Sequence, residues 1–470
     1  MDLNPKQFLQ SATIALQDIQ LQTALDRATG TVTRNRDMAM GELPHAEALR
    51  QQARGARLRA LADLPELLEL LEKNLTAKGV HVLWAKDDAE ANQHVIDICK
   101  AKNLKRGVKS KSMVTEETGL QQAFAENGIE MIETDLGEFI VQISGDHPSH
   151  IIMPVMHRTK EAVRDIFMEK LGMPYTDEPG DMTAYARKTL RRKYLEADFG
   201  MSGGNFLIAE TGTIVIVTNE GNGRLSTGMP PVHIAMVGIE KVIPTWEDFI
   251  TLVQLLARNG TGQRLTVYVN IFNGPTQGEG DGPKEMYLIL VDNGRSNIYA
   301  TEYAEALACI RCGACLNVCP VYQNVGGHSY GSVYPGPIGS VLTPLFKGKE
   351  NASPLPFASS LCGACKMTCP VDINIPDMLI SLRRDLQGEQ ELFWQLGMKA
   401  YAFGFSHPLL FQMGGKAVSA AADKLAPRNP DGTIKALPYP FSGWTQNRDF
   451  PPPAEKSFHD WWRENRETRD

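Results

Sequence analysis

The chain has 470 residues, of which 43% are hydrophobic and 22% are charged, a composition typical of soluble globular proteins. Its length suggests about three domains, and its net charge of -7 gives no reason to expect a nucleic acid partner. Because no apolar run approaches the ~20 residues of a membrane helix and the start, Met1-Asp-Leu-Asn-Pro5, lacks an export signal, we expect a cytoplasmic protein without a direct membrane span.

Residues 1–70 are predicted to form an N-terminal helical segment. Apolar residues recur at helical spacing around Phe8 and Ile14, and the Leu-rich run that starts at Leu64 continues that period. Arg-rich and Ala-rich turns are expected between them, at 53–59. We interpret this segment as a solvated packing arm. Its basic positions are interleaved with Asp and Glu further on, which argues against a stripe that binds nucleic acid.

Residues 71–298 are predicted to form an α/β domain with a mostly parallel sheet, because short apolar strands alternate with helical stretches. A helix is expected at 88–102, and Cys99 on its apolar side is predicted to be a buried packing residue. The expected strands lie at 80–84, 112–114, 129–132, 205–208, 213–217, 233–237, 265–269 and 286–291.

Three segments of this domain are candidates for ligand chemistry. Residues 109–117 end a strand and open a helix, which places hydroxyl groups and Glu116 or Glu117 where an α/β crevice lies. Residues 210–213 form a tight turn, and residues 219–228 form a glycine-rich loop whose amides can hold an anion. None matches a nucleotide-binding fingerprint, and ordinary turn or capping chemistry is favoured for each.

Three histidines, His147, His150 and His157, cluster in the sequence and suggest metal ligands. Their spacing matches no zinc signature, and no cysteine or carboxylate set accompanies them. A metal site at these histidines is therefore not favoured.

Seven of the eight cysteines lie in two runs, from Cys309 to Pro320 and from Cys362 to Pro370. The first run has the C-x2-C-x2-C-x3-C-P spacing of a bacterial [4Fe-4S] site, and in two-cluster ferredoxins the last cysteine of each run ligates the other cluster. Disulfides and structural zinc both fit this spacing poorly. The predicted ligands are Cys309, Cys312, Cys315 and Cys369 for cluster 1, and Cys319, Cys362 and Cys365 for cluster 2.

Cluster 2 is therefore one thiolate short. Aligning the two runs places Ser359 where a leading cysteine would stand. The fourth iron then takes Ser359, water or a ligand from a partner, or the cluster has three irons. The sequence does not choose among these.

Residues 299–392 are predicted to form a two-[4Fe-4S] ferredoxin-like domain of the helical type, since helices flank both runs. The Gly- and Pro-rich segment 321–360 is expected to be a loop that covers a cluster, with Tyr330 and Tyr334 as packing residues. Contact with a substrate or redox partner is the alternative for this loop.

Residues 393–470 are predicted to form a C-terminal helical and Pro-rich arm, extended from Ala422 onward. Six aromatic residues in this arm are expected to dock on the chain itself or on a partner subunit: Phe441, Trp444, Phe450, Phe458, Trp461 and Trp462.

The chain resembles the lactate utilization protein B family along nearly its whole length. The resemblance rests on residues 109–117, 197–200 and 209–213 of the α/β domain, followed by the two cysteine runs. It implies an α/β fold related to sugar-phosphate isomerases and CoA transferases, and two [4Fe-4S] clusters on the seven cysteines. It also implies two partners, a cysteine-rich iron-sulfur protein and a smaller protein of the same α/β domain, which together oxidise L-lactate to pyruvate.

The resulting hypothesis is an iron-sulfur electron-transfer subunit, non-catalytic or co-catalytic, that relays electrons to an unidentified acceptor. One alternative is a catalytic chain that binds a small hydroxy acid near Arg224, Ser226 and Thr227, or at the three-thiolate cluster. A second alternative makes the α/β domain a docking module that assembles the complex.

Overall fold

The computed structural model describes residues 4–387, 392–439, 441–446, 448–454 and 456–466. The chain divides into two compact units, Met1–Leu386 and Gln387–Asp470. The first unit holds the α/β region and both cysteine runs together, because helices from the N-terminal segment bridge them. The finer division at residues 70, 298 and 392 stays a prediction.

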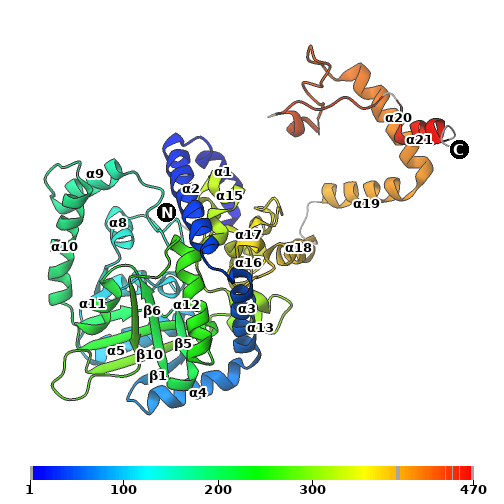
Figure 1. Ribbon diagram of the computed structural model, residues 1–470. Coiled ribbons are helices and arrows are strands. Elements are labelled where there is room, and N and C mark those ends of the chain that lie inside the picture. The colour runs from blue at the N-terminus through cyan, green and yellow to red at the C-terminus, as the bar shows by residue number, and fades with distance from the viewer. Residues whose placement is uncertain (1–3, 388–391, 440, 447, 455, 467–470) are drawn as a thin grey trace. The chain divides into compact units, whose positions relative to one another are not determined.

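A six-stranded parallel sheet forms the centre of the α/β region, which confirms the predicted fold class (Figure 1). Its strands in spatial order are β1 His81–Ala85, β10 Glu285–Val291, β7 Val232–Gly238, β4 Phe199–Ser202, β2 Arg106–Lys109 and β3 Glu130–Glu133. Both faces are covered, as parallel sheets require. In β7, Ile234 and Met236 face one core and Ala235 and Val237 face the other.

Helices cover the two faces. On one face lie α5 Asp88–Ala101, α6 Met113–Glu117 and α7 Leu120–Glu126. On the other face lie α4 Leu64–Thr76 and a second sheet. Cys99 of α5 is buried among apolar side chains, as predicted.

The second sheet has the strand order β8 Val242–Ile243, β5 Phe206–Ile208, β6 Thr213–Thr218 and β9 Tyr268–Phe272. Strands β5 and β6 pair antiparallel across residues 210–213, so this segment is the tight turn that the sequence predicts. Gly212 has a φ of +56°, and a Cβ atom there would lie 2.8 Å from the backbone of Asn74, so the turn requires glycine. The remaining α/β elements are α8 Leu136–Ser144, α9 Lys160–Leu171, α10 Pro179–Leu195, η2 Ala209–Thr211, α11 Asn222–Gly228, η3 Ile239–Lys241, α12 Trp246–Thr261 and α13 Arg295–Tyr299.

The strand predicted at 112–114 is wrong. Ser112 is the N-cap of α6, and its hydroxyl accepts a hydrogen bond from the Thr115 amide at 3.5 Å. The strand lies earlier, in β2, where Gly107 lowers the apparent strand propensity of the sequence. The strand predicted at 265–269 lies three residues further on, in β9.

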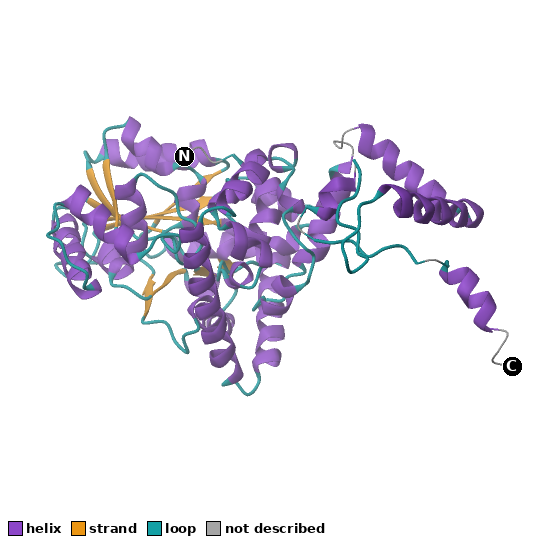
Figure 2. Ribbon diagram, turned by 90° about the horizontal axis from the view of Figure 1, so that it is seen from above, coloured by secondary structure: helices purple, strands orange, loops and turns teal. Residues whose placement is uncertain are grey.

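The cysteine runs lie in a helical region, as predicted, and the strands gather toward one side of the first unit (Figure 2). Its elements are η4 Ala304–Ala308, α14 Ala314–Asn317, α15 Pro320–Val325, η5 His328–Tyr330, α16 Gly336–Lys347, η6 Glu350–Ala352, η7 Leu355–Phe357, α17 Ala364–Thr368 and α18 Ile375–Asp385. The loop expected at 321–360 is therefore wrong, since most of it is helical. Tyr330 and Tyr334 are buried, which confirms their packing role.

The N-terminal segment is helical but is not a solvated arm. It forms η1 Pro5–Gln7, α1 Phe8–Ala15, α2 Ile19–Gly41 and α3 Ala46–Ala62, followed by α4. The Arg-rich stretch 53–59 lies within α3, not in turns. Helices α2 and α3 pack against α12 and against the cysteine-containing region, and Arg57 is fully buried between them.

The second unit contains α19 Leu392–Ser406, α20 Pro408–Leu425, η9 Phe441–Thr445 and α21 Phe458–Arg466. Many of its large apolar side chains are exposed, including Trp444, Phe458, Trp461 and Trp462. None of the described helices is long and apolar enough to cross a membrane.

Replacing Gly200 with alanine is expected to destabilise the α/β domain strongly. A Cβ atom at Gly200 of β4 would lie 1.7 Å from the Ser226 carbonyl oxygen of α11, which is backbone and cannot rotate away. We expect a loss of about 3 kcal/mol or more in the free energy of unfolding, at the upper end of overpacking costs. Urea unfolding of Gly200→Ala measures it, with Gly228→Ala, where no atom lies within 4 Å, as the control. Equal midpoints for both variants would contradict the close approach.

Candidate metal centres and the adjoining cavity

Four cysteines from the two runs meet around one small cavity. Cys309 follows η4, Cys312 precedes the N-cap of α14, Cys315 lies within α14, and Cys369 follows α17. The four line the cavity together with Ile338, Ile373 and Ile375. The structure thus brings together the four cysteines predicted for cluster 1, although Cys369 belongs to the second run.

The remaining three cysteines form a second group. Cys319 follows α14, and its thiol lies near those of Cys362 and Cys365: beyond the larger effect of burial, charge repulsion from Cys362 raises the pKa of Cys319, and repulsion from both Cys319 and Cys362 raises that of Cys365. Burial, with Cys319 next, raises the pKa of Cys365 to about 11. Cys362 is exposed, and the Ala364 amide lowers its pKa. The second group is therefore the more accessible of the two.

The first group fits a buried metal cluster. Burial is the main cause that raises the pKa of Cys369 to about 12, and it raises the pKa of Cys312 and Cys315 as well. Thiols buried together release their protons when a cation is bound among them. The isoleucine side chains keep water away from the same space.

The two runs repeat one backbone turn. Arg311 and Gly313 have φ values of 59° and 73°, and Leu361 and Gly363 have 55° and 82°. In the first run the Arg311 amide donates to the Cys309 sulfur at 3.4 Å. In the second run the Leu361 amide donates to the Ser359 hydroxyl oxygen at 3.1 Å. Ser359 therefore stands in this turn where Cys309 stands in the first.

Arginines of α3 hold the cysteine loops. Arg50 donates to the Cys369 carbonyl at 2.7 Å and to the Lys366 carbonyl at 2.8 Å. Arg57 donates to the Ala308 carbonyl at 3.2 Å, and also to carbonyls of the α/β region. Sequence reasoning missed these roles. The available evidence was the spacing of Arg50, Arg54 and Arg57, which puts all three on one helix face.

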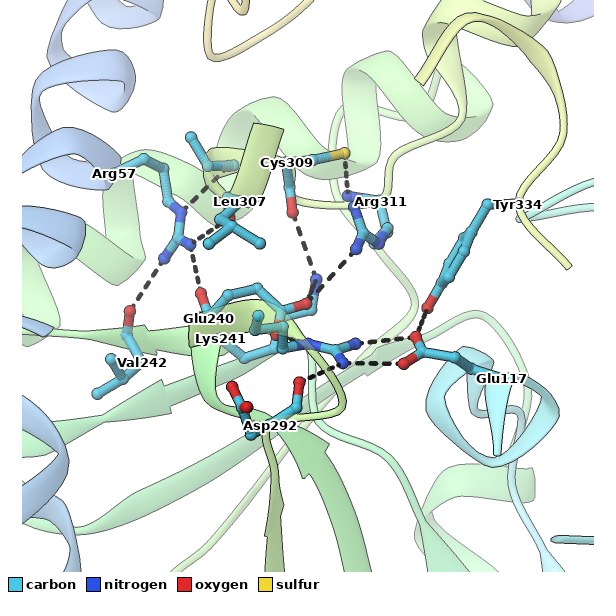
Figure 3. Close-up of polar contacts among 12 residues, drawn as sticks. Arg57, Glu117, Glu240, Lys241, Val242, Asp292, Leu307, Cys309, Arg311 and Tyr334 are labelled. Atoms are coloured by element: carbon cyan, nitrogen blue, oxygen red, sulfur yellow. Dashed lines mark hydrogen bonds and ion pairs between the residues drawn. The ribbon is translucent and has the colours of Figure 1, made fainter. Parts of the chain in front are cut away.

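A buried charge network joins the α/β region to the first cysteine run (Figure 3). Arg295 is fully buried and forms two hydrogen bonds with Glu117, at 2.8 and 2.9 Å, and one with Glu240 at 2.5 Å. Tyr334 donates to Glu117 at 2.7 Å. Glu117, a candidate crevice residue, therefore has a structural partner. The Lys241 ammonium donates to the Cys309 carbonyl at 3.4 Å.

A cavity of about 360 Å³ lies beside this network, at the carboxyl ends of β2, β4 and β7. Residues 110–114 line it, so the segment 109–117 does lie at the α/β crevice. Gly203, Gly204 and Asn205 after β4 line it, and Arg311 and Tyr334 from the cysteine-containing region close it. The cavity thus spans both regions of the first unit.

The glycine-rich segment 219–228 contributes only in part. Asn219, Glu220, Asn222 and Gly223 line the cavity, but Arg224 is exposed and lies outside the lining. The Ser226 hydroxyl bonds to that of Thr134, and the Thr227 hydroxyl donates to the Gly223 carbonyl within α11. The hydroxy-acid site suggested at Arg224, Ser226 and Thr227 is therefore wrong, because the segment is a helix whose hydroxyls have structural partners.

Two of the three histidines, His150 and His157, have separate structural roles. His150 is buried, its Nδ1 accepts the amides of Ile152 and Met153, and burial lowers its pKa to about 3. His157 contacts Asp146 at 2.9 Å and packs against His328, with ring centroids 4.5 Å apart.

Three family models match successive parts of the chain. A LUD domain matches residues 68–291, a 4Fe-4S dicluster domain matches residues 305–373, and the C-terminal domain of lactate utilisation protein B matches residues 384–467. All seven cysteines of the two runs fall in the second match. The chain therefore carries two [4Fe-4S] clusters, which confirms the prediction from the cysteine runs.

Curated relatives match over nearly their whole length. Lactate utilization protein B of Bacillus licheniformis is 44% identical over 100% of this chain and 99% of its own. The proteins of the same name from Shouchella clausii and Bacillus subtilis are 45% and 43% identical, over 95% and 98% of this chain and 94% and 97% of their own. A crystal structure of a DUF162 family protein from Deinococcus radiodurans aligns with a TM-score of 0.29 and 15% identity, over 48% of this chain and 98% of its own.

Proposed function

Because the chain belongs to the lactate utilization protein B family, we propose that it is the iron-sulfur electron-transfer subunit of a complex that oxidises L-lactate to pyruvate. The observation that carries the proposal is the crossed arrangement of the two cysteine groups. Cys315 belongs to the first group and Cys319 to the second, about one helical turn apart. Clusters held by these two residues are close enough to form a relay.

In this proposal Cys309, Cys312, Cys315 and Cys369 ligate cluster 1, and Cys319, Cys362 and Cys365 ligate cluster 2. Oxidation of a hydroxy acid to an oxo acid releases two electrons, and each cluster supplies one-electron chemistry. The buried first group and the more exposed second group suggest a direction, with cluster 2 facing the redox partner.

The chain's own residues position and tune the relay. Isoleucine side chains exclude water around the first group, and the Arg311 amide donates to the Cys309 sulfur. Hydrogen bonds to sulfur and burial are both determinants of cluster potential. Arg50 and Arg57 fix the cysteine loops by binding their carbonyl oxygens.

We further propose that the carbon chemistry is completed with two partner subunits, a cysteine-rich iron-sulfur protein and a smaller protein of the same α/β domain. The exposed aromatic residues of the second unit offer a surface of the type that protein partners bury. The final electron acceptor lies outside this chain.

An anaerobic iron and sulfide count, combined with electron paramagnetic resonance before and after dithionite, tests the cluster assignment in the purified chain. We expect two cubane clusters whose reduced signals interact magnetically, because the groups are adjacent. Two isolated signals without interaction would contradict the relay.

A further inference from the structure

The cavity beside the first cysteine group lies where open α/β sheets bind ligands. In the strand order, β2 is followed in the chain by β3, its neighbour toward one edge of the sheet, whereas β4 is followed in this sheet by β7, its neighbour toward the opposite edge. The carboxyl ends of β2 and β4 therefore flank a topological switch point, and the loops that follow both strands line the cavity. Its volume of about 360 Å³ is within the usual range for small-molecule sites.

Arg311 supplies a buried cation at the inner wall. Its side chain is 7% exposed, and neither terminal nitrogen has a hydrogen-bond partner among the residues that the structure describes. Glu240 lies 3.5 Å away as an ion pair, and the guanidinium stacks 4.7 Å above the Tyr334 ring. A buried guanidinium with free donors is costly unless it meets an anion.

At the inner wall two cations, Arg311 and Lys241, face a single carboxylate of the lining, that of Glu240. Lys241 also lines the cavity, and its nearest carboxylate, Glu240, already binds Arg295. Lys111 lines the cavity as well, but it pairs with Glu138 at 3.5 Å, and the carboxylates Asp135 and Glu220 belong to the same lining, so the excess is confined to Arg311 and Lys241. The charge of cluster 1 can balance part of this excess, but Arg311 and Lys241 also line the cavity.

The rest of the lining favours an organic ligand over a simple inorganic anion. Apolar side chains of Met113, Ile152, Ile216 and Leu256 line the cavity, and the hydroxyl groups of Ser110 and Ser112 lie on the β2 side. A carboxylate can bind the cations while a short carbon chain contacts the apolar part.

We propose that this cavity binds a small organic carboxylate, with Arg311 and Lys241 holding the carboxylate group next to cluster 1. That the carboxylate is the 2-hydroxy acid substrate or its 2-oxo acid product rests on the proposed function. The binding itself does not.

Calorimetric titration of the holoprotein with pyruvate and with L-lactate tests the site, with inorganic phosphate as the comparison anion. We expect pyruvate to bind more tightly than phosphate, and Arg311→Gln and Lys241→Gln each to weaken pyruvate binding by about tenfold or more, the loss of about 1.4 kcal/mol. Arg224→Gln is the matched control, because Arg224 is exposed outside the cavity. Affinity unchanged in both cavity variants, or no pyruvate binding at all, would overturn the proposal.

A second readout avoids dependence on the variants, since Arg311 lies inside a cysteine run. Pyruvate should change the electron paramagnetic resonance spectrum of the reduced wild-type holoprotein, because the anion binds beside cluster 1. An unchanged spectrum would refute the placement. If pyruvate binds but lactate does not reduce the clusters in the complex, this site is upheld and the relay is rejected. If lactate reduces the clusters but pyruvate does not bind, the relay is upheld and this site is rejected.

The repeated turn carries a second, independent inference. Because the Ser359 oxygen accepts the Leu361 amide as the Cys309 sulfur accepts that of Arg311, we infer that Ser359 is the fourth ligand of cluster 2. It binds as an alkoxide, and its proton passes to solvent. Arg383 donates to the Ser359 carbonyl at 3.0 Å and fixes the segment.

Ser359→Ala and Ser359→Cys test this ligand. After mild oxidation we expect the Ser359→Ala protein to show a three-iron signal that the wild type lacks. The Ser359→Cys protein should keep its full iron content and shift the reduced spectrum of cluster 2. Identical spectra for wild type and Ser359→Ala would show that the oxygen does not ligate.

Discussion

Cys369→Ala is expected to remove the same cluster as Cys309→Ala, even though Cys369 follows Cys362 and Cys365 in the chain. The physical reason is that Pro370 and the turn after α17 carry Cys369 into the cavity lined by the first run. Its thiol lies near those of the first run: beyond the larger effect of burial, Cys309 raises the pKa of Cys369, and Cys369 raises the pKa of Cys312 and Cys315. We expect either substitution to abolish cluster 1.

Electron paramagnetic resonance of dithionite-reduced variants measures this grouping. Cys369→Ala and Cys309→Ala should give the same spectrum, that of cluster 2 alone. Cys319→Ala and Cys362→Ala should both give the spectrum of cluster 1 alone. Iron and sulfide content should fall by one cluster or more in each variant. A Cys369→Ala spectrum that matches Cys362→Ala would mean that each run ligates its own cluster.

Arg295→Met is expected to lower the free energy of unfolding by about 3–5 kcal/mol, the usual cost of leaving buried carboxylates without their cation. Arg295 is the shared partner of Glu117 and Glu240, and all three are buried. Without it, the buried Glu117 carboxylate has no ion-pair partner among the described residues, and Glu240 keeps only the longer contacts with Arg311 at 3.5 Å and Lys241 at 4.0 Å. Anaerobic urea unfolding followed by circular dichroism measures the change.

An exposed ion pair supplies the control for Arg295. Arg384 binds Glu302 at 2.5 Å, but both side chains are more than half exposed, so Arg384→Met should cost no more than about 1 kcal/mol. Adding Glu117→Gln to Arg295→Met should recover part of the lost stability, because one unpaired charge is removed. A loss in Arg295→Met no larger than in Arg384→Met would contradict a structural role for the network.

The sequence predicted the chemistry better than the surroundings of the site. The cysteine spacing, combined with the ligand pattern of two-cluster ferredoxins, predicted that Cys369 lies with the first run and Cys319 with the second, and the structure places the two cysteines in this way. Alternating strands and helices sufficed for the parallel sheet. The short strands β2 and β4 were not predicted. They contain Gly107 and Gly200, which strand propensity disfavours but which the close packing of the sheet requires.

Long-range pairing accounts for what the sequence could not predict. Arg57 and Arg295 look like ordinary surface residues in the sequence, since nothing local shows that carbonyls and carboxylates distant in the chain meet them. Only the wall of the cavity formed by part of residues 109–117 was predicted. The opposite wall comes from Arg311 and Tyr334, which are distant in the sequence. The Gly- and Pro-rich composition of 321–360 also led to a loop being predicted where α16 lies. A proline near the start of a helix is favourable, so this composition did not exclude a helix.

The relay itself is tested most directly by rapid-freeze electron paramagnetic resonance of this chain assembled with its two partner subunits and mixed with L-lactate. We predict that both clusters of this chain become reduced as fast as pyruvate first appears, and that Cys319→Ala stops electron delivery to the acceptor while cluster 1 is still reduced. Pyruvate formation at the full rate with both clusters remaining oxidised would contradict the account.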